Sequence, residues 1–92
     1  MWTILESHDV HKAVLKVPRE VLSNYEFWKN IVRFQGPQGL RGIRRLHDEA
    51  LKGKRKGERS SRLSIKYRVI YEVEDKTAIV SVLDLTAHDY RR

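Results

Sequence analysis

Acid–base and cationic side chains gather in the second half of the chain. They are His47, Asp48, Glu49, Arg59, Arg62, Arg68, His88 and Tyr90. Such residues can cleave RNA without a metal ion: a base takes the proton of a ribose 2′-OH, that oxygen attacks the adjacent phosphorus, cations stabilise the phosphorane, and an acid protonates the leaving 5′-oxygen. Histidine titrates near neutral pH and suits either proton transfer, whereas arginine binds phosphate in bidentate fashion and stays charged. Each residue alone is more often structural, but the group indicates phosphodiester chemistry.

Other kinds of site find little support in the sequence. Cysteine is absent, which excludes disulfides, thiolate zinc sites and cysteine nucleophiles. His8 and His11 stand three residues apart, but no further ligand is placed with them, so we predict neither a metal nor another cofactor. The segment 36–39 lacks a Walker or dinucleotide-binding pattern, and no serine has the context of a nucleophile elbow.

Composition bounds the class of protein. The chain has 92 residues, of which 40% are hydrophobic and 34% charged, a balance typical of a globular domain rather than a disordered chain. This length fits one domain, which we expect to span residues 1–92. No apolar run approaches the 18 or so residues of a membrane span, and the N-terminus lacks the features of a signal peptide. We therefore expect a cytoplasmic protein with no membrane partner.

The positive charge lies in one segment. Residues 41–68 contain 11 basic and 3 acidic residues, a net charge of +8, whereas the remainder of the chain has 8 basic and 9 acidic residues, a net charge of −1. Such a field favours a polyanionic partner, because Lys and Arg displace counterions from phosphates. The alternative is a solvated face that serves solubility.

The first half of the chain reads as a strand followed by two helices. Residues 2–5 predict a strand, Asp9 is a plausible N-cap of a first helix, and Pro18 interrupts or restarts the helical pattern. A second helix is predicted from Arg19 to about Gln35. Its apolar stripe, which we interpret as core, comprises Val21, Leu22, Tyr25, Trp28, Ile31 and Val32.

The second half changes to strand periodicity. Irregular segments come first: a loop at 36–42, one helical turn at 46–51 and an exposed basic turn at 53–57. Residues 62–73 then alternate with the period of a strand, and their length predicts a tight turn near 64–67. Residues 77–85 form a further apolar strand. The predicted class is α+β: one small antiparallel or mixed sheet in the order β-α-α-β-β-β, with the two N-terminal helices packed on one face.

Four segments together carry a resemblance to a known family. They are His47–Gly53 (HDEALKG), Arg59–Ser64 (RSSRLS), Tyr67–Val73 (YRVIYEV) and His88–Tyr90 (HDY). In combination they resemble the RelE/ParE toxin superfamily, above all its ribosome-dependent mRNA interferases (RelE, YoeB, YafQ and HigB relatives). The resemblance covers about residues 40–92, and extends to the N-terminal half only through length and element order.

The resemblance implies a toxin of a type II toxin–antitoxin system that enters the ribosomal A site and cleaves mRNA. By position, it implies transition-state stabilisation by Arg68, contact of Arg62 with the scissile phosphate, general acid or base chemistry at His88, and stacking of Tyr90 on a base. Glu49 matches the general base, although His47 is chemically apt and stays open as an alternative. The cations expected to bind RNA are Lys52, Lys54, Arg55, Lys56, Arg59 and Lys66.

The same resemblance leaves other functions open. The ParE branch shares the fold and poisons DNA gyrase without cutting RNA, and a non-catalytic RNA-binding domain is a third alternative. Arginine, histidine and tyrosine at the matching positions favour RNA cleavage, because gyrase poisoning needs no proton-transfer groups. The expected partners are the ribosome, mRNA and a cognate antitoxin, whose acidic and partly disordered segment would suit the +8 segment.

Overall fold

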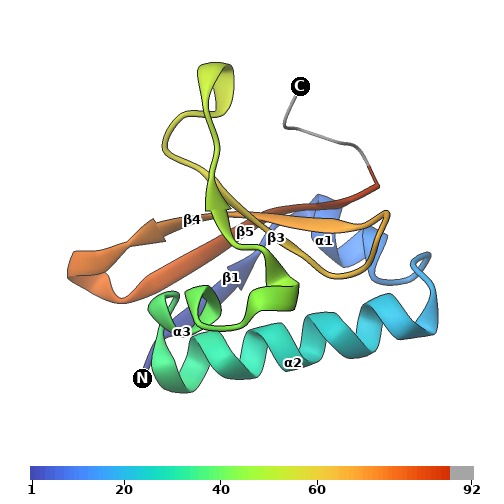
Figure 1. The fold of residues 1–92 in the computed structure, drawn as a ribbon, viewed down its shortest axis with the longest axis horizontal. Coiled ribbons are helices and arrows are strands. Elements are labelled where there is room, and N and C mark those ends of the chain that lie inside the picture. The colour runs from blue at the N-terminus through green and yellow to red at the C-terminus, as the bar shows by residue number, and fades with distance from the viewer. Residues whose placement is uncertain (88–92) are drawn as a thin grey trace.

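A five-stranded mixed sheet organises residues 1–87, which are the residues that the computed structural model describes (Figure 1). Its strands lie in the order β1-β5-β4-β3-β2. The strand bounds are β1 Thr3–Glu6, β2 Glu49–Ala50, β3 Arg59–Arg62, β4 Arg68–Glu74 and β5 Ile79–Thr86. The helix bounds are α1 His8–Ala13, α2 Arg19–Gln35 and α3 Gln38–Arg41, with single 3₁₀ turns η1 at Arg44–Leu46, η2 at Gly53–Arg55 and η3 at Asp75–Thr77.

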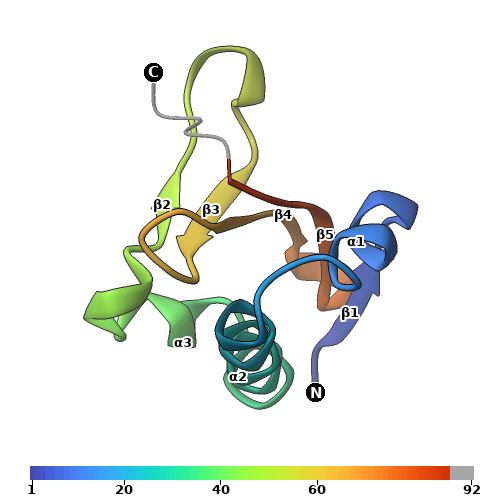
Figure 2. The ribbon, with the colours of Figure 1, turned by 90° about the vertical axis from the view of Figure 1, so that its right-hand side faces the viewer.

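The sheet combines one parallel pair with three antiparallel pairs. β1 runs parallel to β5, with Thr3 opposite Ile79, whereas β5, β4, β3 and β2 are antiparallel to their neighbours. Helix α2 covers one face of the sheet, as Figure 2 shows end-on. Val10 of α1 joins the same buried cluster as the α2 side chains, so both N-terminal helices bury residues in one core. The predicted α+β class with helices on one face of a mixed sheet is therefore confirmed.

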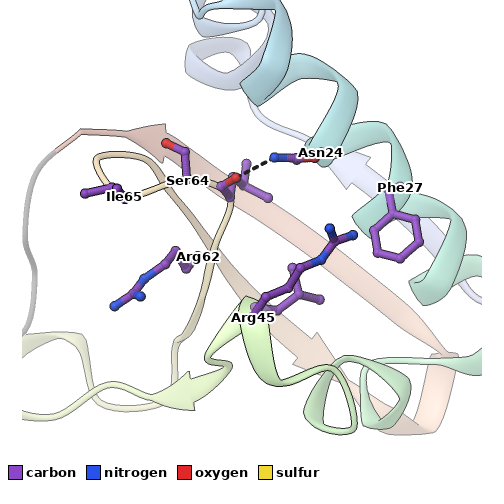
Figure 3. A pocket seen from close by; sticks show the side chains of 8 residues that line it. Asn24, Phe27, Arg45, Arg62, Ser64 and Ile65 are labelled. Carbon is purple, nitrogen blue, oxygen red and sulfur yellow. Dashed lines mark hydrogen bonds between the residues drawn. The ribbon is translucent and has the colours of Figure 1, made fainter.

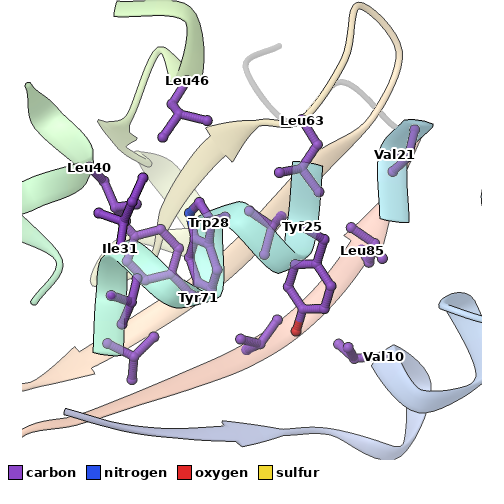
Figure 4. Packing of buried hydrophobic residues seen from close by; sticks show 14 residues of the cluster. Val10, Val21, Tyr25, Trp28, Ile31, Leu40, Leu46, Leu63, Tyr71 and Leu85 are labelled. Carbon is purple, nitrogen blue, oxygen red and sulfur yellow. The ribbon is translucent and has the colours of Figure 1, made fainter. Parts of the chain in front are cut away.

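Three aromatic rings form the centre of the core between α2 and the sheet (Figure 4). Tyr25, Trp28 and Tyr71 are all fully buried. Trp28 stacks on Tyr25 at a centroid distance of 5.9 Å and meets the ring of Tyr71 edge-on at 5.2 Å. Both arrangements are ones that aromatic quadrupoles favour. The interpretation of the α2 stripe as core is confirmed except at Leu22, which is only half-buried and lies outside the core cluster.

Two details of the first half differ from the predictions. Ser7, not Asp9, caps α1, because the Ser7 Oγ accepts a hydrogen bond from the Val10 backbone N–H at 3.2 Å. Asp9 lies instead in the first turn, where a carboxylate also interacts favourably with the helix dipole. The predicted loop at 36–42 contains the short helix α3, which begins after Pro37 and buries Leu40 completely.

The predicted helical turn at 46–51 is wrong. The 3₁₀ turn η1 ends at Leu46, His47 adopts a left-handed conformation with φ 45°, and Glu49–Ala50 then pair with β3 as the strand β2. The reason is a set of long-range hydrogen bonds to Asp48, described below, that holds this segment against the sheet edge.

The strand predictions hold for β4 and β5 with small shifts, but β3 spans Arg59–Arg62 and ends where the predicted alternation of residues 62–73 begins. The tight turn predicted near 64–67 is confirmed, since Leu63 donates its backbone N–H to the Tyr67 carbonyl at 2.9 Å. β5 begins at Ile79 rather than residue 77, because η3 and the left-handed Ala78 occupy the turn before it. None of the helices within residues 1–87 combines the length and apolar character needed to cross a bilayer.

Candidate active site

The register of the sheet gathers several predicted site residues on the face that α2 leaves uncovered. Arg62 of β3 pairs with Arg68 of β4, and Glu49 of β2 pairs with Ser60 of β3. Side chains at paired positions point to the same face, and neighbours along a strand point to opposite faces. Val69 joins the core beneath α2, so Arg68 faces the other way.

Arg68 lies buried at the centre of this uncovered face. Arg68 is 6% exposed, and its Nη1 donates a hydrogen bond to the Ser60 Oγ at 3.5 Å. The same Nη1 lies 3.8 Å from the Glu49 Oε2, forming an ion pair between β4 and β2. A guanidinium is always charged, and such partners offset the cost of burying it and hold its orientation. Arg68 is therefore a fixed, oriented cation.

His47 extends this ion pair toward solvent. Its Nε2 lies 3.9 Å from the Glu49 Oε1, and half of its side chain is exposed. His47, Glu49 and Arg68 thus form a continuous chain of contacts from the surface to the buried guanidinium. Three of the predicted catalytic residues are brought together, including both candidates for the general base.

The other predicted catalytic residues are Arg62, His88 and Tyr90. Arg62 lies opposite Arg68 in the ladder, and its Nε is buried without a hydrogen-bond acceptor among residues 1–87. His88 and Tyr90 lie outside the described residues. The last residue of β5, Thr86, pairs with Arg68.

Asp48 belongs to the acid–base residues of the sequence but has no predicted role, and the structure shows that it organises the site. Its side chain is fully buried. Its Oδ2 accepts hydrogen bonds from Arg59 Nη2 at 2.7 Å and Nε at 3.1 Å, and its Oδ1 accepts from Ser61 Oγ at 2.8 Å and from the Tyr71 hydroxyl. Ser61 in turn accepts from the Trp28 indole N–H at 3.0 Å, which ties the network to the core. Because Asp48 stands between His47 and Glu49, it fixes the backbone of both.

The network also sets the charge states of its members. Burial lowers the pKa of Arg59, but the hydrogen bonds and charge of Asp48 outweigh it and leave the pKa above its usual value. Burial is the main cause of a raised pKa of the Tyr71 hydroxyl, and the nearby Asp48 carboxylate raises this pKa further. Arg59, predicted to bind RNA, is thus a permanent cation whose charge faces Asp48.

The remaining predicted RNA-binding cations lie on projecting turns. The segment 51–58 rises from the sheet on the side away from α2 (Figure 1), with Lys52, Lys54 and Lys56 exposed. Arg55 pairs with Glu58 at 3.0 Å across η2. Lys66 is exposed on the turn between β3 and β4. Across residues 1–87, no three His, Cys, Asp or Glu side chains converge as metal ligands would.

No protein-family model matches the sequence, and no functionally curated protein matches it either. Solved structures do match. The archaeal RelE of a RelE–RelB complex from Pyrococcus horikoshii superposes with a TM-score of 0.73 at 22% identity, over 92% of each chain. A heterotetrameric YoeB–YefM toxin–antitoxin complex from Staphylococcus aureus gives 0.74 at 18% identity, over 97% of this chain and 99% of the other. YafQ from Escherichia coli gives 0.70 at 15% identity, over 94% and 92%.

The fold defined by these comparisons is that of small bacterial and archaeal toxins. The chain has the fold of RelE, YoeB and YafQ along nearly its whole length. The resemblance drawn from residues 47–90 is thereby confirmed at the level of the fold, and it extends over the N-terminal half as well.

Proposed function

We propose that this chain is the toxin of a type II toxin–antitoxin pair and that it cleaves mRNA on the ribosome. The observation that carries the proposal is the contact chain His47–Glu49–Arg68, on the sheet face that α2 leaves uncovered and beside the cationic segment 51–58. A fold alone does not define an activity, but this arrangement supplies a carboxylate, an imidazole and a fixed cation within contact of one another.

The proposed chemistry is metal-independent cleavage by the ribose 2′-OH. Glu49, with His47 as the alternative, accepts the 2′-OH proton. Arg68 stabilises the negative charge of the phosphorane, and Arg62 contacts the scissile phosphate beside it. His88 protonates the leaving 5′-oxygen and Tyr90 stacks on a base. The RNA backbone is bound by Lys52, Lys54, Arg55, Lys56 and Lys66. The proposed site of action is the ribosome in the cytoplasm.

A cognate antitoxin is the second part of the proposal. RelE was solved with RelB and YoeB with YefM, which supports an inhibitory partner for a chain of the same fold. The +8 segment at 41–68 favours an acidic and partly disordered partner that folds on binding. A small acidic protein encoded next to this chain, able to relieve its growth arrest, would identify that partner.

The central experiment compares the wild type with Arg68→Ala in a translation reaction with purified ribosomes and a defined mRNA. We expect wild-type cuts within the A-site codon, and at least about a hundredfold slower cleavage by R68A, the usual effect of removing a transition-state donor. Arg19→Ala, an exposed arginine at the start of α2, is the matched control and should cleave normally. Circular dichroism and thermal unfolding test whether R68A is folded.

The same experiment separates the alternatives. Cleavage that needs no ribosome would correct the target while keeping the chemistry. Intact mRNA together with inhibition of gyrase supercoiling would replace the proposal with a ParE-like function. Salt-sensitive RNA binding with neither activity would leave a non-catalytic RNA-binding domain.

A further inference from the structure

An apolar pocket opens between α2, η1 and the turn that joins β3 to β4 (Figure 3). Its volume is about 150 Å³. Leu46 and Leu63, both buried, form its floor, and Phe27 and Ile65 stand at its rim. Ile65 is 96% exposed and Phe27 40% exposed, so apolar surface is left in contact with water here. The volume is that of a cavity able to hold one six-carbon group.

Cations surround this pocket. Arg45 and Arg62 line it, and no acidic side chain is among the described residues that do. Arg44, which precedes Arg45, and Lys66, which follows Ile65, are exposed beside the pocket. Arg62 contributes to the lining, but Figure 3 shows its guanidinium turned away from Phe27 and Arg45. An occupant that brings carboxylates to this rim would form charge-assisted hydrogen bonds with Arg45 and Lys66.

The lining favours a peptide side chain over a nucleobase. The guanidinium of Arg45 lies 4.7 Å from the centroid of Phe27 and covers one face of the ring, which would otherwise offer a stacking platform. The side-chain amide of Asn24 already donates to the Leu63 carbonyl at 2.7 Å. The rest of the floor is aliphatic, and it would leave the polar edges of a base without partners.

We propose that this pocket anchors the antitoxin, through one large aliphatic side chain of an acidic segment whose carboxylates pair with Arg45 and Lys66. The identity of the partner rests on the proposed function. Arg62 belongs both to the pocket lining and to the pair with Arg68 in the β3–β4 ladder, so the pocket adjoins the active face. An occupant of the pocket needs no contact at Glu49.

The test is a titration of the ¹⁵N-labelled full chain with two synthetic peptides. One has the sequence Ac-Glu-Glu-Ala-Leu-Ala-Glu-Glu-amide, and the other has Ala in place of Leu. We expect the leucine peptide to bind about tenfold more tightly, because loss of a buried apolar group costs at least that factor in a hydrophobic pocket. Its binding should shift the amide resonances of Phe27, Leu63 and Ile65.

Two exposed aliphatic residues supply matched variants. Ile65→Asp removes the apolar rim and adds a negative charge, so it should abolish the preference for leucine over alanine. Leu15→Asp makes the same change at a residue that is 85% exposed and lies outside the pocket lining, and it should keep that preference. Both side chains lie in water, so neither change threatens the core.

Equal affinity for the two peptides would overturn the proposal, because charge alone would then explain binding. Shifts of the pocket resonances by a single-stranded oligoribonucleotide, without any by the leucine peptide, would overturn it in favour of an RNA subsite. Neither result depends on RNA cleavage. If the chain prefers the leucine peptide but cleaves no RNA, only the proposed function is contradicted. If it cleaves RNA without that preference, only the role of the pocket is contradicted.

Discussion

Asp48 joins three donor side chains from two neighbouring strands while its own side chain is fully buried. Asp48→Asn keeps the shape of the side chain but removes the anion that faces Arg59. We expect a loss of about 3 kcal/mol in the free energy of unfolding, because breaking a buried ion pair leaves an uncompensated charge. Urea denaturation measures it, with Asp75→Asn on an exposed turn as the control. An unchanged urea midpoint for D48N would contradict the assignment.

Glu49 and His47 can be separated as candidates for the general base. Glu49 contacts both Arg68 and His47, whereas His47 contacts only the outer oxygen of Glu49 among the ion pairs described. We therefore expect Glu49→Gln to slow single-turnover cleavage on the ribosome by about 10²–10⁴-fold, the typical contribution of a general base. His47→Gln should have a smaller effect. The reverse order would assign the proton transfer to His47.

The candidate site was only partly predictable at the level of residues. Arg62 and Arg68 could be placed together because strand alternation and a tight turn between them are local signals. The contacts of Asp48 could not be predicted, because its partners lie 11, 13 and 23 residues further along the chain and no periodicity relates them to Asp48. The same long-range bonds explain why residues 46–51 form a strand where local pattern favoured a helical turn.

Among the elements, the segment between β2 and β3 depends on two glycines. Gly53 and Gly57 have φ of 66° and 98°, and nothing lies within 4 Å of a Cβ added at either position. The requirement is thus one of backbone conformation and not of space. It explains why the exposed basic turn predicted at 53–57 has a glycine at each end.

Gly57→Ala should therefore destabilise the fold by about 1–2 kcal/mol, the cost of a left-handed conformation for a residue with a Cβ. Gly42→Ala is the matched control: Gly42 has φ −80° and its nearest neighbour would lie 3.9 Å away. That change should be neutral or stabilise the protein slightly by restricting the unfolded chain. Thermal unfolding of both variants gives the comparison, and equal effects would show that the turn imposes no backbone constraint.

Element pairing shows the limit of sequence reasoning for the fold. The strand β4 and the turn before it follow from alternation within a dozen residues, whereas β3 begins at Arg59, ahead of the alternating segment. The parallel pairing of β1 with β5 joins Thr3 to Ile79, and β1 fills the edge of β5 opposite β4. Such a pairing leaves no local trace in the sequence.

At the scale of the whole molecule, Glu6 ties β1 to α2. Its Oε2 accepts hydrogen bonds from the Tyr25 hydroxyl at 2.6 Å and the Lys29 ammonium at 3.2 Å. Burial raises the pKa of Glu6, but these hydrogen bonds and the charges of Lys29 and His11 outweigh it and leave the pKa below its usual value. The folded state thus holds the carboxylate ionised more strongly than the unfolded chain does.

The stabilisation that ionised Glu6 contributes should be fully present above the pKa of this carboxyl in the unfolded chain, about 4.5. It should be lost as the pH falls through the lower pKa of Glu6 in the folded protein. We expect Glu6→Gln to lower the melting temperature at pH 7 and to flatten its decline between about pH 5 and 3. Glu72→Gln, an exposed carboxylate on β4, should leave the decline unchanged. Parallel melting curves for E6Q and wild type across this pH range would refute the linkage.

The position of β5 also governs when the sheet can be completed. This strand follows all the other described strands in the chain, yet it lies between β1 and β4, and Thr86 at its end pairs with Arg68. A nascent polypeptide that stops before Ile79 has neither a ladder for β1 nor a second neighbour for β4. Translation must therefore pass Ile79 before the sheet can close, and a product released earlier should be unable to complete the fold.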